Sequence, residues 1–294
     1  MAFSKAFNNL LNDALTFLEK NLTVTTKEVP SGTHRLVEVN GWRDDEAISA
    51  LAIYLVALRA SVIDQAGRIC SDLIDSPRDF ANDLVRSVDE IVIQPTDSDE
   101  PASEWKSKWR NPWIAEGLWH CCMRLAMERA DIHQHGTVIA VDLPHVSPKD
   151  HGLDVTALYV NSDGDLGLSF VETKAYRKQP NKAIIDALKM LKSIEAGEYD
   201  TRLRQMITSL RSVIDEPYKQ QLTSSLWKDE RTHIPNPHYE INGSTVRWHT
   251  RRRKFLELSA PVVIMPHGIN GFRAFFEDVA NEMRQKAQEV AAYV

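Results

Sequence analysis

Two short runs of alternating and apolar residues, joined by a turn, decide the fold of this chain. They read LDVTALYV (153–160), NSDGD (161–165) and LGLSFVETKA (166–175). The outer runs are rich in Val, Leu, Phe, Tyr and Thr, which favour strands, while Asn, Asp and Gly favour a tight turn. We therefore expect strands over 153–160 and 166–175, paired as a β-hairpin.

The second strand ends in Glu172-Thr173-Lys174. Because side chains alternate along a strand, Glu172 and Lys174 share one face, and Val171 points to the other face as a core residue would. Asp154, near the start of the first strand, is positioned to join them. Asp150 is the alternative partner if that strand begins earlier.

Two carboxylates beside a lysine have the chemistry that phosphodiester hydrolysis needs. Carboxylate oxygens bind Mg²⁺ (or Mn²⁺), which polarises a phosphate and lowers the pKa of a bound water. An adjacent ammonium group can orient the attacking water and neutralise charge that develops on the phosphorus. We expect Asp154, Glu172 and Lys174 to be catalytic, with Asp154 and Glu172 as metal ligands.

Basic residues follow this motif. The chain carries a formal net charge of -6, yet residues 174–254 contain 17 Lys+Arg against 9 Asp+Glu. Such a split predicts a cationic surface on an otherwise acidic protein, as a nucleic-acid partner requires. A helix expected from Asn181 carries lysines opposite its apolar face. The candidate phosphate contacts are Arg177, Lys178, Lys182, Lys189 and Lys192, and solvated helix faces are the competing interpretation for this charge.

The rest of the chain divides near residue 100. Residues 1–100 form an expected N-terminal, mostly helical region: helices over 7–18, 44–68 and 77–91, and a strand pair over 23–28 and 34–39 with its turn at 30–32. A polar, proline-bounded segment at 94–101 ends this region. Residues 101–294 form the expected nuclease domain with a C-terminal elaboration. It includes a helix capped by Asn111-Pro112, strands over 138–143, 245–249 and 261–265, and a closing helix over 275–290.

The spacing of Gly152-Leu153-Asp154 and Glu172-Thr173-Lys174, between an upstream helix carrying Glu116 and a downstream basic helix, resembles the PD-(D/E)xK nuclease superfamily. The resemblance covers roughly residues 105 to 212, and Leu153 stands where the named motif has proline. It implies an α/β fold, a restriction-endonuclease-like mixed sheet flanked by helices. It also implies that Glu116 is a further metal ligand.

More narrowly, the chain resembles HamA proteins, the nuclease subunits of Hachiman anti-phage defence systems, which work beside a helicase, HamB. The sequence has no Gly-x-x-x-x-Gly-Lys-[Ser/Thr] motif, so an ATP-driven step would need such a partner. The resemblance implies a Mg²⁺-dependent DNase acting in antiviral defence under the control of a helicase. A non-catalytic subunit that binds nucleic acid or a helicase on the same scaffold is the alternative, and an RNA substrate stays open.

No apolar run approaches the roughly 18 residues that cross a bilayer, and residues 1–20 alternate apolar with polar side chains. We therefore expect a cytoplasmic protein without membrane contact.

Overall fold

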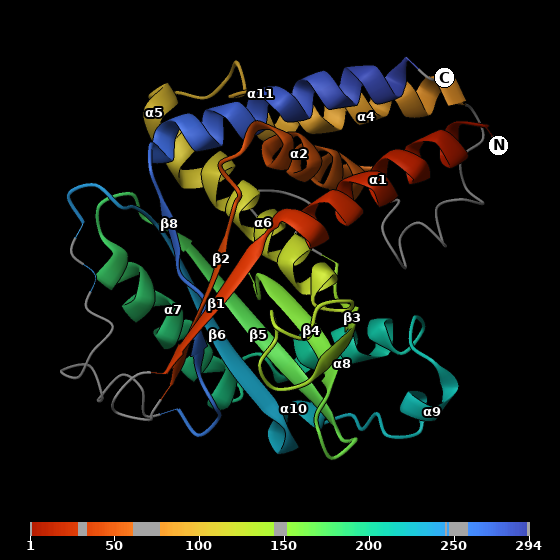
Figure 1. Ribbon diagram of the computed structural model, residues 1–294, viewed down its shortest axis with the longest axis vertical. Coiled ribbons are helices and arrows are strands. Elements are labelled where there is room, and N and C mark those ends of the chain that lie inside the picture. Colours follow the sequence, from red (N-terminus) through yellow and green to blue (C-terminus); the bar gives the residue numbers. More distant parts are fainter. Residues whose placement is uncertain are drawn as a thin grey trace.

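The computed structural model describes residues 2–28, 34–60, 77–143, 152–244, 246 and 258–292. Within them the chain is a mixed α and β protein, in which two mixed sheets are flanked by helices (Figure 1). The helices are α1 (Ala2–Asn21), α2 (Asp45–Arg59), α4 (Pro77–Val92), α5 (Ala102–Trp105), the π-helix η1 (Lys106–Arg110), α6 (Asn111–Leu125), α7 (Pro180–Glu195), α8 (Asp200–Leu210), α9 (Glu216–Lys219), α10 (Leu226–Asp229) and α11 (Phe272–Ala291). The strands are β1 (Thr23–Glu28), β2 (Arg35–Asn40), β3 (Thr137–Val141), β4 (Val155–Val160), β5 (Leu166–Ala175), β6 (Arg231–Glu240), β7 (Val263–Ile264) and β8 (His267–Ile269).

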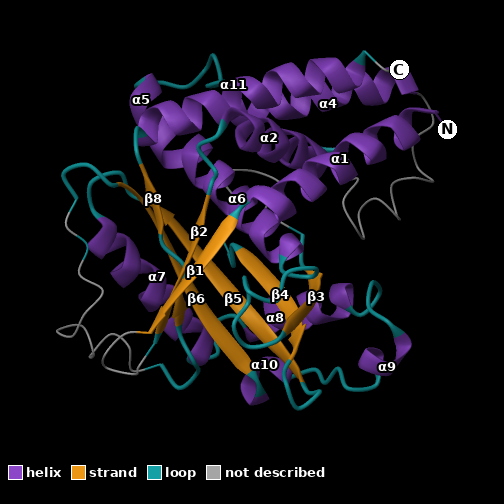
Figure 2. Ribbon diagram, viewed as in Figure 1, coloured by secondary structure: helices purple, strands orange, loops and turns teal. Residues whose placement is uncertain are grey.

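The larger sheet has the order β3-β4-β5-β6-β8. Strands β3, β4 and β5 pair antiparallel, and the predicted β4–β5 hairpin is confirmed, with Val155 opposite Val171. Strands β5, β6 and β8 pair parallel. Parallel neighbours need a long crossover, which α7 to α10 provide between β5 and β6. The smaller sheet, β1-β2-β7, lies on the β6–β8 side of the larger one, where His233 of β6 also bridges Val262 (Figure 2).

Strand β6 is an interior strand of the larger sheet and was not expected from the sequence. It contains Pro235 and Pro237, and proline ordinarily argues against a central strand because it has no N–H to donate. The structure accommodates both prolines because the backbone nitrogen atoms of Pro235 and Pro237 face the same side of β6, away from β5. The carbonyl of Pro235 accepts from the N–H of Met265, on the side away from β5, while Tyr176 N–H bonds the carbonyl of His238 on the β5 side. The missing N–H groups thus fall outside the β5–β6 ladder.

Two hydrophobic cores cover the two faces of the larger sheet. The first contains side chains of α1, α2, α4, α6 and α11, together with Val155 and Val171 from the sheet. The second contains side chains of α7 and α8, together with Leu168 and Phe170 from β5. Figure 1 shows α1, α2, α4 and α11 gathered in one helical layer. Residues 1–100 thus share a core with the C-terminal helix, and the expected boundary near residue 100 stays a prediction.

Several expected elements have different bounds in the structure. Asn111 does not begin a helix as a cap, because α5, η1 and α6 follow one another without a break and Arg110 before it is already helical. Helix α2 ends at Arg59, and the rest of its expected span, 61–68, lies largely outside the described residues. The expected turn at 30–32 and most of the expected strand at 245–249 also lie outside them. No helix in the described ranges has both the length and the apolar character to cross a membrane.

Candidate active site

The β4–β5 hairpin brings Asp154 next to the Glu172-Thr173-Lys174 segment. Asp154 lies one residue before β4, and the register of Val155 opposite Val171 places it beside Glu172. The backbone N–H of Thr173 donates a hydrogen bond of 2.7 Å to Asp154 Oδ2. This bond holds the carboxylate against the end of β5, and the two predicted carboxylates are therefore neighbours.

Glu172 and Lys174 form a partly buried ion pair. Lys174 Nζ donates to Glu172 Oε1, and Glu172 is only 3% exposed. Both residues lie on the face of β5 that carries Phe170, as alternation requires, and the helix α7 covers that face. The sequence analysis expected one core-facing side of this strand, and the structure shows that both sides are buried.

The pKa of Glu172 reflects its burial and the charged groups around it. Burial, followed by the charge of Asp154, raises the pKa of Glu172 well above its usual range, and Lys174 opposes this shift. Burial alone would lower the pKa of Lys174, but the charges of Glu172 and Asp154 raise it above its ordinary value. Lys174 is thus a cation at neutral pH, held by two carboxylates.

Glu116 reaches the same cluster from α6. It is 7% exposed, and its charge contributes to the raised pKa of Glu172. Glu172 and Asp154 thus act on one ammonium group while the charge of Glu116 adds to that around Glu172, which leaves an excess of negative charge. An additional cation would relieve this excess, because opposite charge lowers the cost of ionising a carboxylate.

The donor set suits a hard divalent cation. Mg²⁺ binds through one or two carboxylates and keeps several waters, which matches Asp154 and Glu172 with Glu116 nearby. Within the described ranges no three His, Cys, Asp or Glu side chains are already arranged as a metal cage. A fourth candidate, Asp150, lies outside the described residues.

The predicted phosphate contacts lie at the end of β5 and along α7. Lys182 and Lys189 share Asp186, at 3.2 and 3.5 Å, and Lys182 also lies over the ring of Tyr176. Lys178 and Lys192 are exposed. Arg177 approaches Glu240 at 3.9 Å, and its Nε is buried without a hydrogen-bond partner.

The sequence analysis missed a second basic group, in the segment Lys106-Ser107-Lys108-Trp109-Arg110. This segment is the π-helix η1, and Arg110 is 2% exposed although it carries a charge. The sequence shows three basic residues within these five positions. It does not show that they lie near the end of β5, because that position depends on how α6 packs on the sheet.

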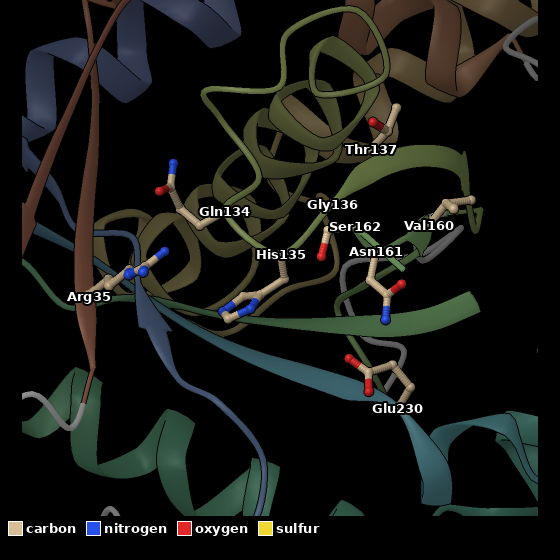
Figure 3. A pocket seen from close by; sticks show the side chains of 9 residues that line it. All are labelled: Arg35, Gln134, His135, Gly136, Thr137, Val160, Asn161, Ser162 and Glu230. Atoms are coloured by element: carbon tan, nitrogen blue, oxygen red, sulfur yellow. The ribbon is translucent and has the colours of Figure 1, made fainter. Parts of the chain in front are cut away.

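A separate polar pocket of about 520 Å³ lies at the opposite end of the larger sheet (Figure 3). His135 lies between Arg35 and Glu230 there, and its Nε2 makes no hydrogen bond in the described part of the chain. Burial and the charge of Arg35 lower the pKa of His135. None of the predicted site residues lines this pocket.

Comparison with known proteins adds no relative. No protein-family model matches the chain, and no curated protein matches it at a significant level. Function is therefore inferred from the site itself.

Proposed function

We propose that this protein is a metal-dependent nuclease that hydrolyses phosphodiester bonds in DNA. The observation that carries the proposal is the meeting of Asp154, Glu172 and Lys174 at the end of β5, with Glu116 contributing charge from α6. A mixed sheet flanked by helices also agrees with what the resemblance to PD-(D/E)xK nucleases implies.

In this proposal Asp154 and Glu172 hold Mg²⁺ (or Mn²⁺), with Glu116 as a further ligand. The bound metal supplies Lewis-acid stabilisation of the phosphate and a water of lowered pKa. Lys174 stays protonated beside Glu172, so it is suited to position the attacking water and to stabilise the negative charge that grows on the phosphate oxygens. Thr173 N–H keeps Asp154 turned towards this point.

The resemblance to HamA extends the proposal to antiviral defence with a helicase partner. An acidic protein, with formal net charge -6, repels DNA over much of its surface, so a partner would deliver the substrate or release the activity. Full activity of the isolated chain on plain duplex DNA would argue against this part of the proposal.

The test is cleavage of plasmid, single-stranded DNA and RNA in Mg²⁺ or in EDTA, with and without a co-encoded helicase. We expect metal-dependent cutting by the wild type and a loss of about 100-fold or more in Glu172→Gln and in Lys174→Met. Lys27→Met on β1 is the matched control, since it removes an exposed lysine that pairs with Glu38 and lies outside the predicted site. If wild type and variants behave alike under every condition, the chain is a non-catalytic subunit on the same scaffold.

A further inference from the structure

A cleft of about 530 Å³ opens one residue beyond the predicted site. Its walls come from three elements that are distant in sequence: η1 with the start of α6, the end of β5, and the start of α11. Ala175 and Arg177, which follow Lys174 along the chain, both line it. By strand alternation Ala175 faces the core of α6 and α11, opposite to Glu172 and Lys174, so the cleft opens at the same end of β5 as the carboxylate cluster but on the other face of the strand.

The cleft carries an excess of positive charge. Its charged lining residues are Lys106, Arg110, Arg177 and Arg273 against Glu104 and Glu277. Four cations facing two carboxylates leave a surplus of two positive charges, on a protein whose formal net charge is -6. In a partly enclosed space such a surplus attracts anions more strongly than it would on an open surface.

One wall of the cleft already binds an oxyanion. Glu277 accepts from Arg110 Nη1 and Nη2, each at 3.0 Å, and from Lys106 Nζ at 2.7 Å. Asn111 Oδ1 accepts from Arg110 Nε and Nη2, which fixes the guanidinium plane. A forked guanidinium held in this way binds carboxylate and phosphate oxygens with the same geometry.

The facing cations are available to a ligand. Arg273, exposed on α11, makes no ion pair or hydrogen bond within the described ranges of the chain. Arg177 Nε lies 3.9 Å from Glu240 Oε2 without a hydrogen bond, and Glu240 accepts hydrogen bonds from the N–H groups of Gly271 and Phe272. Arg177 is therefore only partly neutralised, and it lines the cleft.

We infer that this cleft binds a phosphate group of a nucleic-acid strand, with Arg177 and Arg273 as its contacts and Arg110 and Lys106 as the supporting wall. The inference rests on the proposed function for the kind of ligand, a nucleic-acid strand, because the cleft opens at the same end of β5 as the carboxylates. The π-helical turn η1, which lies between α5 and α6, fits this role because π-helical turns occur frequently at functional sites.

The experiment measures binding separately from cleavage. Fluorescence anisotropy of a labelled single-stranded oligonucleotide, in EDTA and about 0.1 M salt, compares the wild type with Arg273→Glu and with Arg177→Gln. Arg273→Glu should weaken binding about tenfold or more and reduce the salt slope by about one unit. The control, Arg284→Glu, makes the same charge change about 16 Å further along α11, beyond the Debye length, and should change affinity less than roughly twofold.

Oligonucleotides with a 5′-phosphate and with a 5′-hydroxyl distinguish the source of the phosphate. An equal loss with both probes assigns the cleft to a backbone phosphate, and a loss with the phosphorylated probe alone assigns it to a terminal one. The inference is overturned if Arg273→Glu and Arg284→Glu bind alike, or if the wild type binds neither probe.

The two proposals can fail independently. If the wild type cuts DNA in a metal-dependent way and Arg273→Glu binds as the wild type does, the nuclease proposal stands and the phosphate-binding cleft is rejected. If Arg273→Glu binds more weakly and the wild type cuts nothing under any condition, the phosphate-binding cleft stands and the nuclease proposal is rejected.

Discussion

At the scale of single residues, Asp154 has two functions that substitution can separate. Its carboxylate contributes charge to the cluster, and its Oδ2 accepts the N–H of Thr173, a residue that is itself buried. An amide of the same shape keeps the acceptor and loses the charge. An alanine loses both.

We therefore expect Asp154→Asn and Asp154→Ala to abolish cleavage alike but to differ in stability. Asp154→Ala leaves the buried N–H of Thr173 without its acceptor, which costs about 1–3 kcal/mol, whereas Asp154→Asn avoids this cost. Urea denaturation of both variants measures the difference. Equal stabilities would show that the acceptor is unimportant.

At the scale of elements, the ion pair of Glu277 ties α11 to the π-helix η1. Hydrogen bonding by Arg110, followed by the charge and hydrogen bond of Lys106, lowers the pKa of Glu277 from 4.5 to about 2, against the effect of partial burial. The side chain of Glu277 is 38% exposed, so solvent screens much of this interaction.

A lowered carboxyl pKa stabilises the fold above the unfolded value of 4.5, and this contribution is lost as the pH falls towards 2. Glu277→Gln should therefore lower the free energy of unfolding by about 1 kcal/mol at pH 7, with a smaller difference from wild type below pH 4.5. Denaturation at several pH values measures this. The control is Asp278→Asn, an exposed carboxylate on the same helix, and a pH-independent difference for Glu277→Gln would contradict the assignment.

At the scale of the whole molecule, α11 joins the two ends of the chain in one core. Phe276 is fully buried, makes a tilted ring contact with Phe272 and an edge-on contact with Phe275, and belongs to the core that also contains side chains of α1 and α2. Because each layer buries its apolar face against the other, we expect the N-terminal region to unfold together with the sheet.

Phe276→Ala should lower the free energy of unfolding by about 3–5 kcal/mol, since it removes a large side chain from a fully packed place. Circular dichroism and tryptophan fluorescence should then report a single, coincident transition at lower denaturant. Two separated transitions would instead support independent folding of residues 1–100. Arg284→Ala, exposed on the same helix, should leave the midpoint nearly unchanged.

The sequence by itself determined the local features of this protein. The β4–β5 hairpin, the shared face of Glu172 and Lys174, and the proximity of Asp154 all follow from strand alternation and a polar turn, which act over a few residues. The closing helix was also readable, because its apolar spacing is periodic.

The tertiary structure alone decided the rest. Strand β6 was hidden by Pro235 and Pro237, whose fit depends on which side of the ladder their missing N–H groups face. The cleft at the end of β5 was hidden because its cations come from η1, from the segment that follows β5 and from α11, and only packing brings these parts together. Contacts between distant segments depend on the global arrangement of helices and sheets, and no local pattern of residues records that arrangement.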